Sequence, residues 1–286
     1  MRIYAVFSTD SDSPRNSASK SASDPNEADV CLDIRQDARV TFETCDPLLK
    51  KHGISTLPYH TTVFDAESVR SVLSSAEAWF LHVKNTNQNN PLKAQLRIEF
   101  FKVVADPLQL NQDWMKPEGN NLNSSGVVTI EANPYEYYGV KVVNESNYDL
   151  HAYLFYFGVS ELNIDSYNRG PVPVRRGQAN FSLRKRSTYS MGHGAAGVLP
   201  FAYQLGEGQT QDVGIIKLFV TTWPANFEML AQESPFNKAR GDPETPSEEE
   251  RANISPMVIR RSLEEQQEYQ WDTQQMVLVQ KAIGSK

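Results

Sequence analysis

The sequence predicts a mainly β protein, with a β-sandwich-like domain over residues 126–286 preceded by an α+β segment over residues 28–115. From residue 126 onward, short β-prone runs alternate with Gly, Asn and polar turn signals, which is the rhythm of sandwiches and barrels. The α+β segment holds one long amphipathic helix, the only extended stretch whose apolar residues repeat with a helical period. A chain of 286 residues can bury a core without disulfides or metals.

Composition and charge exclude several classes of protein. The net charge of −7 argues against a nucleic-acid partner, which would require a basic surface. No run approaches the roughly 18 apolar residues of a membrane span, and "MRIYAVFSTD" is not followed by a cleavage signal. We therefore expect a soluble cytoplasmic protein. Its two cysteines, Cys31 and Cys45, are expected to be reduced thiols, although the sequence leaves open whether they approach one another.

The N-terminal half can be read element by element. Residues 1–27 form a predicted disordered, Ser-rich N-terminus, because after the strand-like "MRIYAVF" they contain too little apolar surface to order. "ADVCLDIRQDARVTFET" predicts a β-hairpin around the polar turn at residues 35–37. "DPLLKKHG" predicts a short helix that ends at Gly53. "ISTLPYHTTVF" predicts an edge strand, because Pro58 cannot donate a ladder hydrogen bond.

The long helix is predicted to begin after Asp65, a suitable N-cap residue. Its apolar stripe consists of Val69, Val72, Leu73, Ala76, Phe80 and Val83. The next segment, "AQLRIEFFKVV", alternates with period two and predicts a strand. "DWMKPEGNNLNSSG" then predicts a loop.

The β-rich half contains eight predicted strands. They are "GVVTIEA", "YYGVKVVNES", "YDLHAYLFYFG", "SELNIDSY", "QANFSL", "LPFAYQL", "DVGIIKLFVTT" and, after a flexible acidic loop at about 237–256, "QWDTQQMVLVQKA". "VNESNYDLHAYLFYF" predicts the best hairpin. Lys217 lies in a run that is apolar on both faces, which predicts a central strand. Its amine is expected to reach the rim of the sheet or to pair with a carboxylate.

The sequence predicts no catalytic, cofactor-binding or metal-binding residues. A cysteine nucleophile needs a nearby histidine, and no local pattern pairs one with Cys31 or Cys45. The metal spacings C-x₂-C, H-E-x-x-H and EF-hand are absent from the sequence. His193 in "YSMGHGAAGVLPF" is a candidate loop contact in a pocket. The alternative is that its neighbouring glycines only allow a tight loop with positive φ.

The most basic stretch is "RRGQANFSLRKRS", residues 175–187. It contains Arg175, Arg176, Arg184, Lys185 and Arg186. In an acidic chain, such a cluster is a candidate binding surface for an acidic partner or for anionic lipid. The alternative is an ordinary solvated hairpin face.

Several segments in a fixed order resemble the C-terminal region of caspase-like (metacaspase-type) multidomain proteins of mushroom-forming fungi. They are "NPLKAQLRIEFFKV", "PEGNNLNSSGVV", "YYGVKVVNESNYDLHAYLFYF", "DVGIIKLFVTT", "NFEMLAQESPF" and "WDTQQMVLV", and the resemblance spans about residues 28–280. It implies an accessory region that follows a caspase-like protease domain. That protease domain carries a His near a glycine and a Cys in an Asp-x-Cys context. No catalytic residue can be carried over to this chain residue by residue, and the relatives are more aromatic at the position of His193.

We therefore expect a non-catalytic regulatory or recognition module that acts on a protein partner, with a caspase-like protease domain as the partner that the resemblance implies. One alternative is a lectin-like ligand-binding sandwich, with Trp114, Tyr137, Tyr138 and Trp223 as stacking residues. A second is binding to a membrane surface through residues 175–187. A third is a fragment of a caspase-like cysteine endopeptidase without its catalytic domain. The oligomeric state is left open.

Overall fold

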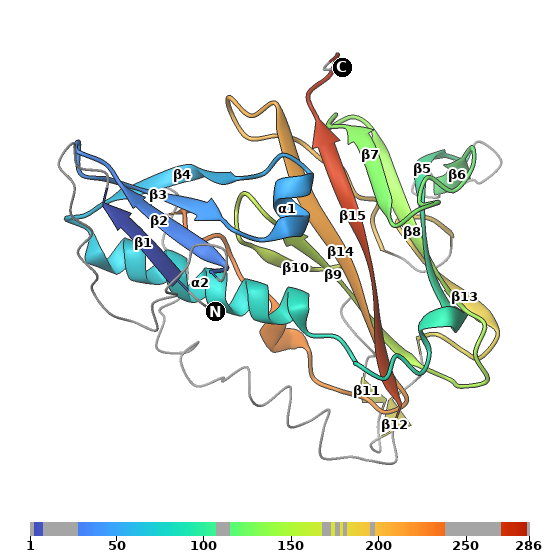
Figure 1. Ribbon diagram of the computed structural model, residues 1–286. Helices are drawn as coiled ribbons and strands as arrows, with labels where there is room; N and C mark the ends of the chain where they lie inside the picture. The colour runs from blue at the N-terminus through green and yellow to red at the C-terminus, as the bar shows by residue number, and fades with distance from the viewer. Residues whose placement is uncertain are drawn as a thin grey trace. The chain divides into compact units, whose positions relative to one another are not determined.

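The computed structural model describes residues 3–7, 28–106, 115–167, 173–174, 178–179, 182–194, 198–237 and 270–284 (Figure 1). Within them the predicted mainly β class is confirmed, and α2 (Ala66–Lys84) is the one helix longer than seven residues. The disordered N-terminus was predicted over residues 1–27, of which residues 3–7 are described and form a strand. The rest of that range and all but the first residue of the predicted acidic loop lie outside the described residues. The chain divides into two compact units.

Unit 1 comprises Met1–Lys84, Gly158–Ile164 and Gln232–Asn253. Its sheet has the strand order β1–β2–β3–β4, formed by β1 (Ile3–Phe7), β2 (Val30–Ile34), β3 (Arg39–Thr44) and β4 (Thr56–Thr62). The predicted β2–β3 hairpin is confirmed, with Cys31 opposite Glu43. β4 is an edge strand, as Pro58 predicted. The strand-like N-terminal run is β1, which pairs in parallel with β2.

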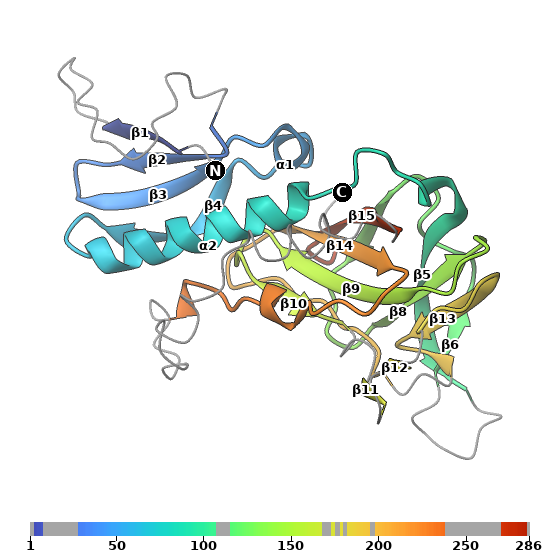
Figure 2. The ribbon, with the colours of Figure 1, turned by 90° about the horizontal axis from the view of Figure 1, so that it is seen from below.

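Both helices of unit 1 begin at an aspartate cap, and for α2 this is the predicted Asp65. In α1 (Pro47–Lys51), the Asp46 Oδ1 atom accepts a hydrogen bond from the Leu48 backbone N–H at 2.9 Å. Before α2, the Asp65 Oδ1 atom accepts one from the Ser68 N–H at 2.9 Å. The helix α2 runs along the β1–β4 sheet (Figure 2). Its buried face contains Val72, Ala76, Phe80 and Val83 from the predicted stripe, together with Trp79.

A segment that follows most of the sandwich strands in the sequence completes the core of unit 1. Phe236 is 1% exposed, and its ring centroid lies 6.1 Å from that of Phe42 and 4.9 Å from that of Tyr59. Glu161 joins the same segment, because its Oε2 atom accepts a hydrogen bond from the Ser234 hydroxyl at 2.6 Å. Unit 1 is thus assembled from three separate stretches of chain.

Unit 2 comprises Asn85–Phe157, Asp165–Ala231 and Ile254–Lys286. One sheet has the order β10–β9–β14–β15–β7 and the other the order β13–β8–β5–β6. The strands are β5 (Leu96–Ala105), β6 (Met115–Glu118), β7 (Val127–Glu131), β8 (Tyr137–Asn144), β9 (His151–Gly158), β10 (Ile164–Ser166), β13 (Ser187–Met191), β14 (Gln211–Thr221) and β15 (Trp271–Lys281). A short separate pair consists of β11 (Pro173–Val174) and β12 (Gln178–Ala179).

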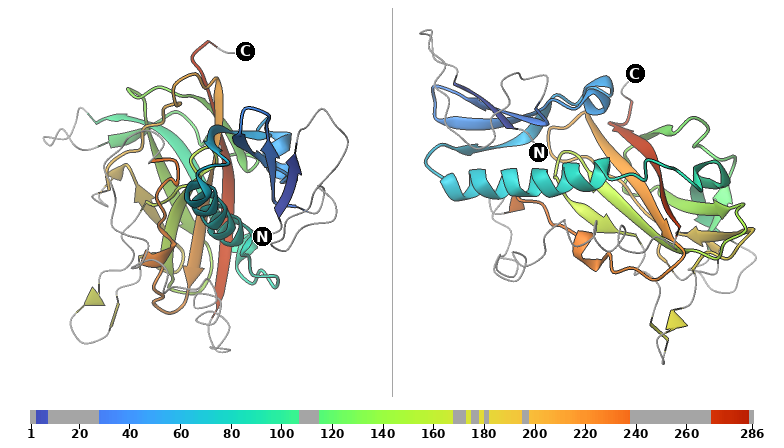
Figure 3. Two further views of the ribbon diagram at one scale, coloured as in Figure 1. Left: turned by 90° about the vertical axis from the view of Figure 1, so that its left-hand side faces the viewer. Right: turned by 60° about the horizontal axis from the view of Figure 1, so that its bottom comes forward.

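The two sheets enclose one hydrophobic core. Its buried side chains come from both sheets, including Phe100 of β5, Val140 of β8, Leu154 of β9 and Leu218 of β14. The long strands β14 and β15 run side by side, coloured orange and red in Figure 3. β15 also pairs in parallel with β7, so the predicted return of the last strand into a sheet is confirmed. β14 lies between β9 and β15, as expected of a central strand.

Three predictions, of a hairpin, a loop and a strand, were wrong. β8 and β9 do not form a hairpin, because β8 pairs with β5 and β13 while β9 lies in the other sheet. The predicted loop after β5 contains β6, which pairs with β5. "LPFAYQL" forms only an isolated bridge between Phe201 and Tyr138. In addition, β5 is a strand of the sandwich, although the sequence grouped it with the α+β segment. Period-two alternation indicates the faces of a strand, but it does not select the neighbouring strand.

Candidate functional site

Two turns of unit 2 lie against each other at the ends of their strands. The basic turn, defined as Arg184, Lys185 and Arg186, precedes β13, and the 145–149 turn connects β8 to β9. Immediately beside them, the Leu150 N–H donates to the Leu183 carbonyl at 2.8 Å, and the Leu183 N–H donates back at 3.0 Å. This reciprocal pair holds the two turns next to one another.

One buried amide, that of Asn144, supports both turns. Asn144 is 1% exposed, and its Nδ2 atom donates to the carbonyls of Tyr148 and Arg184, both at 2.9 Å. Its Oδ1 atom accepts from the Ser146 N–H at 2.9 Å. Because a buried amide with all these partners has little freedom to move, it fixes the backbone of both turns.

Direct hydrogen bonds also join the basic turn to the 145–149 turn. The Lys185 backbone N–H donates to Asp149 Oδ1 at 2.8 Å. The Arg186 N–H donates to the Ser146 carbonyl at 3.2 Å, and the Arg186 Nη2 atom donates to Asn147 Oδ1 at 3.0 Å. Arg186 has a left-handed φ of 52°, a conformation that non-glycine residues keep only where surrounding contacts hold it.

The charges at this site are predominantly positive. All three side chains of the basic turn are exposed. An ion pair joins Arg184 Nη1 to Asp149 Oδ2 at 3.6 Å, and the Arg184 side chain remains 64% exposed. Glu145 is engaged by Arg97, with 2.5 Å between Nη1 and Oε1. Three consecutive cations therefore face solvent beside Tyr148, which is 47% exposed. Arg175 and Arg176, the other predicted members of the cluster, lie outside the described residues.

His193 faces the sheet and not the solvent. It is 7% exposed, and its ring centroid lies 5.9 Å from that of Phe101. A Cβ atom on Gly139 would collide with the His193 Nδ1 atom, which has no hydrogen-bond partner within the described part of the chain. Burial lowers the pKa of the imidazole. The flanking glycines have φ values of 78° and 70°, as the tight-loop interpretation expects.

The prediction of two reduced cysteines is wrong. Cys31 and Cys45 form a disulfide, and their Cα atoms are 6.7 Å apart. The β2–β3 register explains this proximity, because Cys31 lies opposite Glu43, two residues before Cys45. The predicted hairpin together with the short separation of the cysteines was a signal that could have indicated the bond. In this form neither sulfur is a thiolate, so neither can act as a nucleophile.

Of the two environments predicted for the Lys217 amine, the rim of the sheet is wrong. Its side chain is completely buried. The Nζ atom donates to the Asn85 carbonyl at 2.6 Å and lies 5.0 Å from the centroid of the Phe219 ring. Burial lowers the pKa of this amine to about 7.

Of the three described aromatic residues that were considered for ligand stacking, two are buried. Tyr138 is 3% exposed and stacks on Phe100 at a centroid distance of 5.3 Å. Trp223 is 8% exposed, whereas Tyr137 is 41% exposed. Trp114 lies outside the described residues.

Among the described residues, no group of three or more His, Cys, Asp or Glu side chains is arranged to hold a metal ion. No helix in the same part of the chain is long and apolar enough to cross a membrane.

Comparison with protein families, with curated proteins and with solved structures finds no match to this chain.

Proposed function

We propose that the chain is a non-catalytic recognition module that binds an acidic segment of a protein partner through the basic turn. The observation that supports this proposal is the presentation of three consecutive exposed cations on a turn whose backbone is held by the buried Asn144 amide. A preorganised turn loses little conformational entropy on binding. Its positive charge, on a chain with a net charge of −7, favours a negatively charged contact.

The size of the basic turn favours a short acidic segment over a long polyanion. Three adjacent residues match a few carboxylates of one peptide, whereas a nucleic acid or lipid surface would also meet the negative charge of the remaining chain. The half-exposed Tyr148 adds an aromatic contact that suits a peptide. The resemblance to fungal caspase-like proteins suggests one partner to test, a caspase-like protease domain.

The test is binding of a fluorescent ten-residue peptide rich in Asp and Glu, measured by anisotropy at low and at high salt. The double variant R184E/R186E is expected to bind at least tenfold more weakly than the unchanged protein. Binding by the unchanged protein should weaken as salt rises, because the contacts are exposed. N144A should reduce affinity several-fold with all three cations still present, because the turns lose their shared support.

The matched control is K50E/K51E, which makes the same charge change on the exposed side chains of α1. An equal loss of affinity in this control would show that only overall charge matters, and would contradict the proposal. A neutral peptide of the same length should not bind. If vesicles containing phosphatidylserine bind through the basic turn while the acidic peptide does not, the membrane-surface alternative replaces the proposal.

A further inference from the structure

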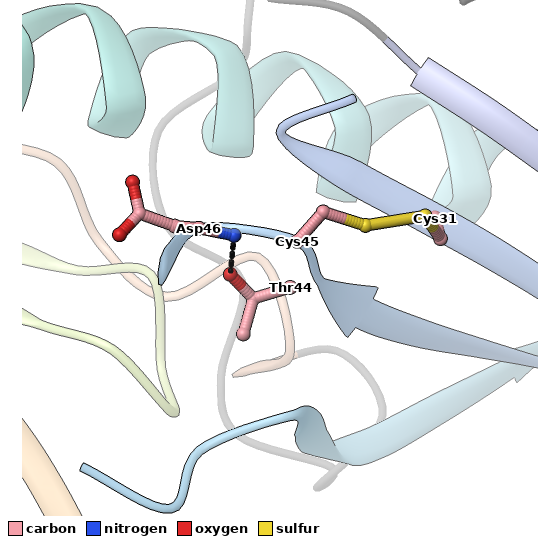
Figure 4. The surroundings of a disulfide bond; sticks show 4 residues. All are labelled: Cys31, Thr44, Cys45 and Asp46. Carbon is pink, nitrogen blue, oxygen red and sulfur yellow. Dashed lines mark hydrogen bonds between the residues drawn. A yellow bond between two sulfur atoms is a disulfide. The ribbon is translucent and has the colours of Figure 1, made fainter. Parts of the chain in front are cut away.

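The Cys31–Cys45 disulfide lies where α1 joins the sheet of unit 1 (Figure 4). Cys31 belongs to β2, and Cys45 lies between the end of β3 and Asp46, the N-cap residue of α1. Figure 4 shows the Asp46 N–H directed at the Thr44 hydroxyl, and the two atoms are 3.3 Å apart. The bond therefore ties the first residue before the cap to a neighbouring strand.

The two cysteines differ in accessibility. Cys31 is 6% exposed and packs in a small buried cluster with Ala28. Cys45 is partly exposed. Thiol–disulfide exchange begins when an external thiolate reaches one sulfur of the bond. Cys45 is the more exposed of the two cysteines, so an external thiolate is expected to attack its sulfur.

Within the described part of the chain, α1 is weakly anchored apart from the disulfide. The helix has five residues, and Leu49 is its one buried side chain. Lys84, at the end of α2, contacts Asp29 Oδ1 at 2.5 Å and Asp46 Oδ2 at 3.5 Å, but the lysine side chain is 50% exposed. An exposed ion pair contributes little, and a helix of this length is not stable by itself.

The sheet, in contrast, has supports that do not involve sulfur. β2 and β3 are joined along five register pairs from Val30↔Thr44 to Ile34↔Val40. The Thr44 N–H donates to the Ser55 carbonyl at 2.9 Å, and the Cys45 N–H donates to the Asp29 carbonyl at 3.0 Å. These backbone bonds keep the two cysteines close whether or not the sulfurs are joined.

We infer that the disulfide is a redox-controlled fastener of α1, open to reduction by dithiols and able to reform. A thiolate of the dithiol attacks the Cys45 sulfur, the bond between the sulfurs breaks, and Cys31 leaves as a thiolate that takes up a proton. The second thiolate of the reagent then attacks the mixed disulfide and releases Cys45. The chain gains two electrons and two protons, and the reagent becomes a disulfide. The reduced chain keeps its sheet but loses the order of α1.

The test is amide hydrogen exchange of the full chain with and without dithiothreitol, combined with counting of alkylated thiols by mass. The chain has two cysteines, so the count reports this bond directly. We expect no alkylated thiol before reduction and two afterwards. Exchange over residues 47–54 should accelerate at least tenfold, while exchange at Leu32 and Phe42 should change less than twofold. Removal of the dithiothreitol in air should restore the slow exchange.

The double variant C31S/C45S should exchange like the reduced protein, with or without dithiothreitol. D46A is the matched control, because it removes the cap of α1 and leaves the sulfurs joined. It should accelerate exchange in α1 without creating an alkylated thiol. The inference is overturned if the protein purified without reductant has two free thiols, or if reduction leaves α1 unchanged. It is also overturned if β2 and β3 lose protection together with α1, since the bond would then support the whole unit.

Discussion

Lys217 shows how strongly one residue can depend on its surroundings. Its amine donates a hydrogen bond to the Asn85 carbonyl and lies in a completely buried position of β14. Burial disfavours the charged form, which is why the pKa falls to about 7. In the unfolded chain the same amine would have the ordinary lysine pKa of about 10.4. Folding therefore disfavours the protonated form of the Lys217 amine.

The pH dependence of stability follows from this difference. Between pH 7 and about 10.4 the unfolded state binds more protons than the folded state, so the free energy of unfolding should rise with pH. Below pH 7 both states carry the proton and the full penalty is present. We predict that K217M is more stable than the unchanged protein near pH 7, by on the order of 2 kcal/mol. This advantage should shrink towards pH 10, as measured by urea denaturation.

K93M is the control for this prediction, because Lys93 has an exposed side chain. It should leave the pH profile unchanged. A K217M variant with the same pH slope as the unchanged protein would show that another group is responsible.

At the scale of elements, β9 and β14 come close together where a tyrosine ring packs against a glycine. The Tyr156 ring of β9 lies over Gly214 of β14, and a Cβ atom there would be 2.5 Å from the Tyr156 Cζ atom. The ring cannot easily move aside, because its hydroxyl accepts a hydrogen bond from Gln280 at 2.8 Å and it stacks on Tyr167 at 5.8 Å. Glycine is therefore required at position 214 by the packing and not by its backbone angle.

We predict that G214A lowers the free energy of unfolding by roughly 1–3 kcal/mol, the usual effect of overpacking a core. The double variant Y156L/G214A should lose less than the sum of the two single variants, because the collision has been removed. Chemical denaturation of all four proteins measures this coupling. Strict additivity would mean that the ring and the glycine do not constrain each other.

Predictability from sequence differed between elements for a physical reason. α2 and the β2–β3 hairpin are determined by neighbours in the chain, so periodicity and turn residues sufficed. The segment between β8 and β9 has similar turn residues. There, however, the Asn144 side chain donates a hydrogen bond to the carbonyl of Arg184, a residue far along the chain. The sequence indicated the three cations of the basic turn. It could not indicate the Asn144 amide that supports them, because that contact depends on which distant turn lies beside the basic turn.

At the scale of the whole molecule, unit 1 depends on a distant part of the chain. Phe236 follows most of the sandwich strands in sequence, yet its ring packs against Phe42 and Tyr59. The Tyr59 hydroxyl also donates to Glu161, whose other carboxylate oxygen accepts from Ser234. Local pattern could not have indicated this contact, because "AQESPFN" contains no strand or helix period.

We predict that F236A destabilises unit 1 by roughly 3–5 kcal/mol, as removal of a fully buried ring generally does. Hydrogen exchange in β3, where Phe42 lies, should accelerate accordingly. M229A is the control, because Met229 is 37% exposed and its truncation should cost less than about 0.5 kcal/mol. Unchanged protection of β3 in F236A would contradict the assignment of this segment to the core of unit 1.

The pairing of β15 also has a consequence for the order in which the protein is made. β15 is the last described strand to leave the ribosome, yet it forms the neighbour of both β14 and β7. Until it is synthesised, β14 has a free edge along eleven residues whose side chains are almost all buried in the finished fold. Unpaired apolar edges bind other unfinished chains. Until β15 arrives, the nascent protein therefore carries an apolar edge that favours aggregation.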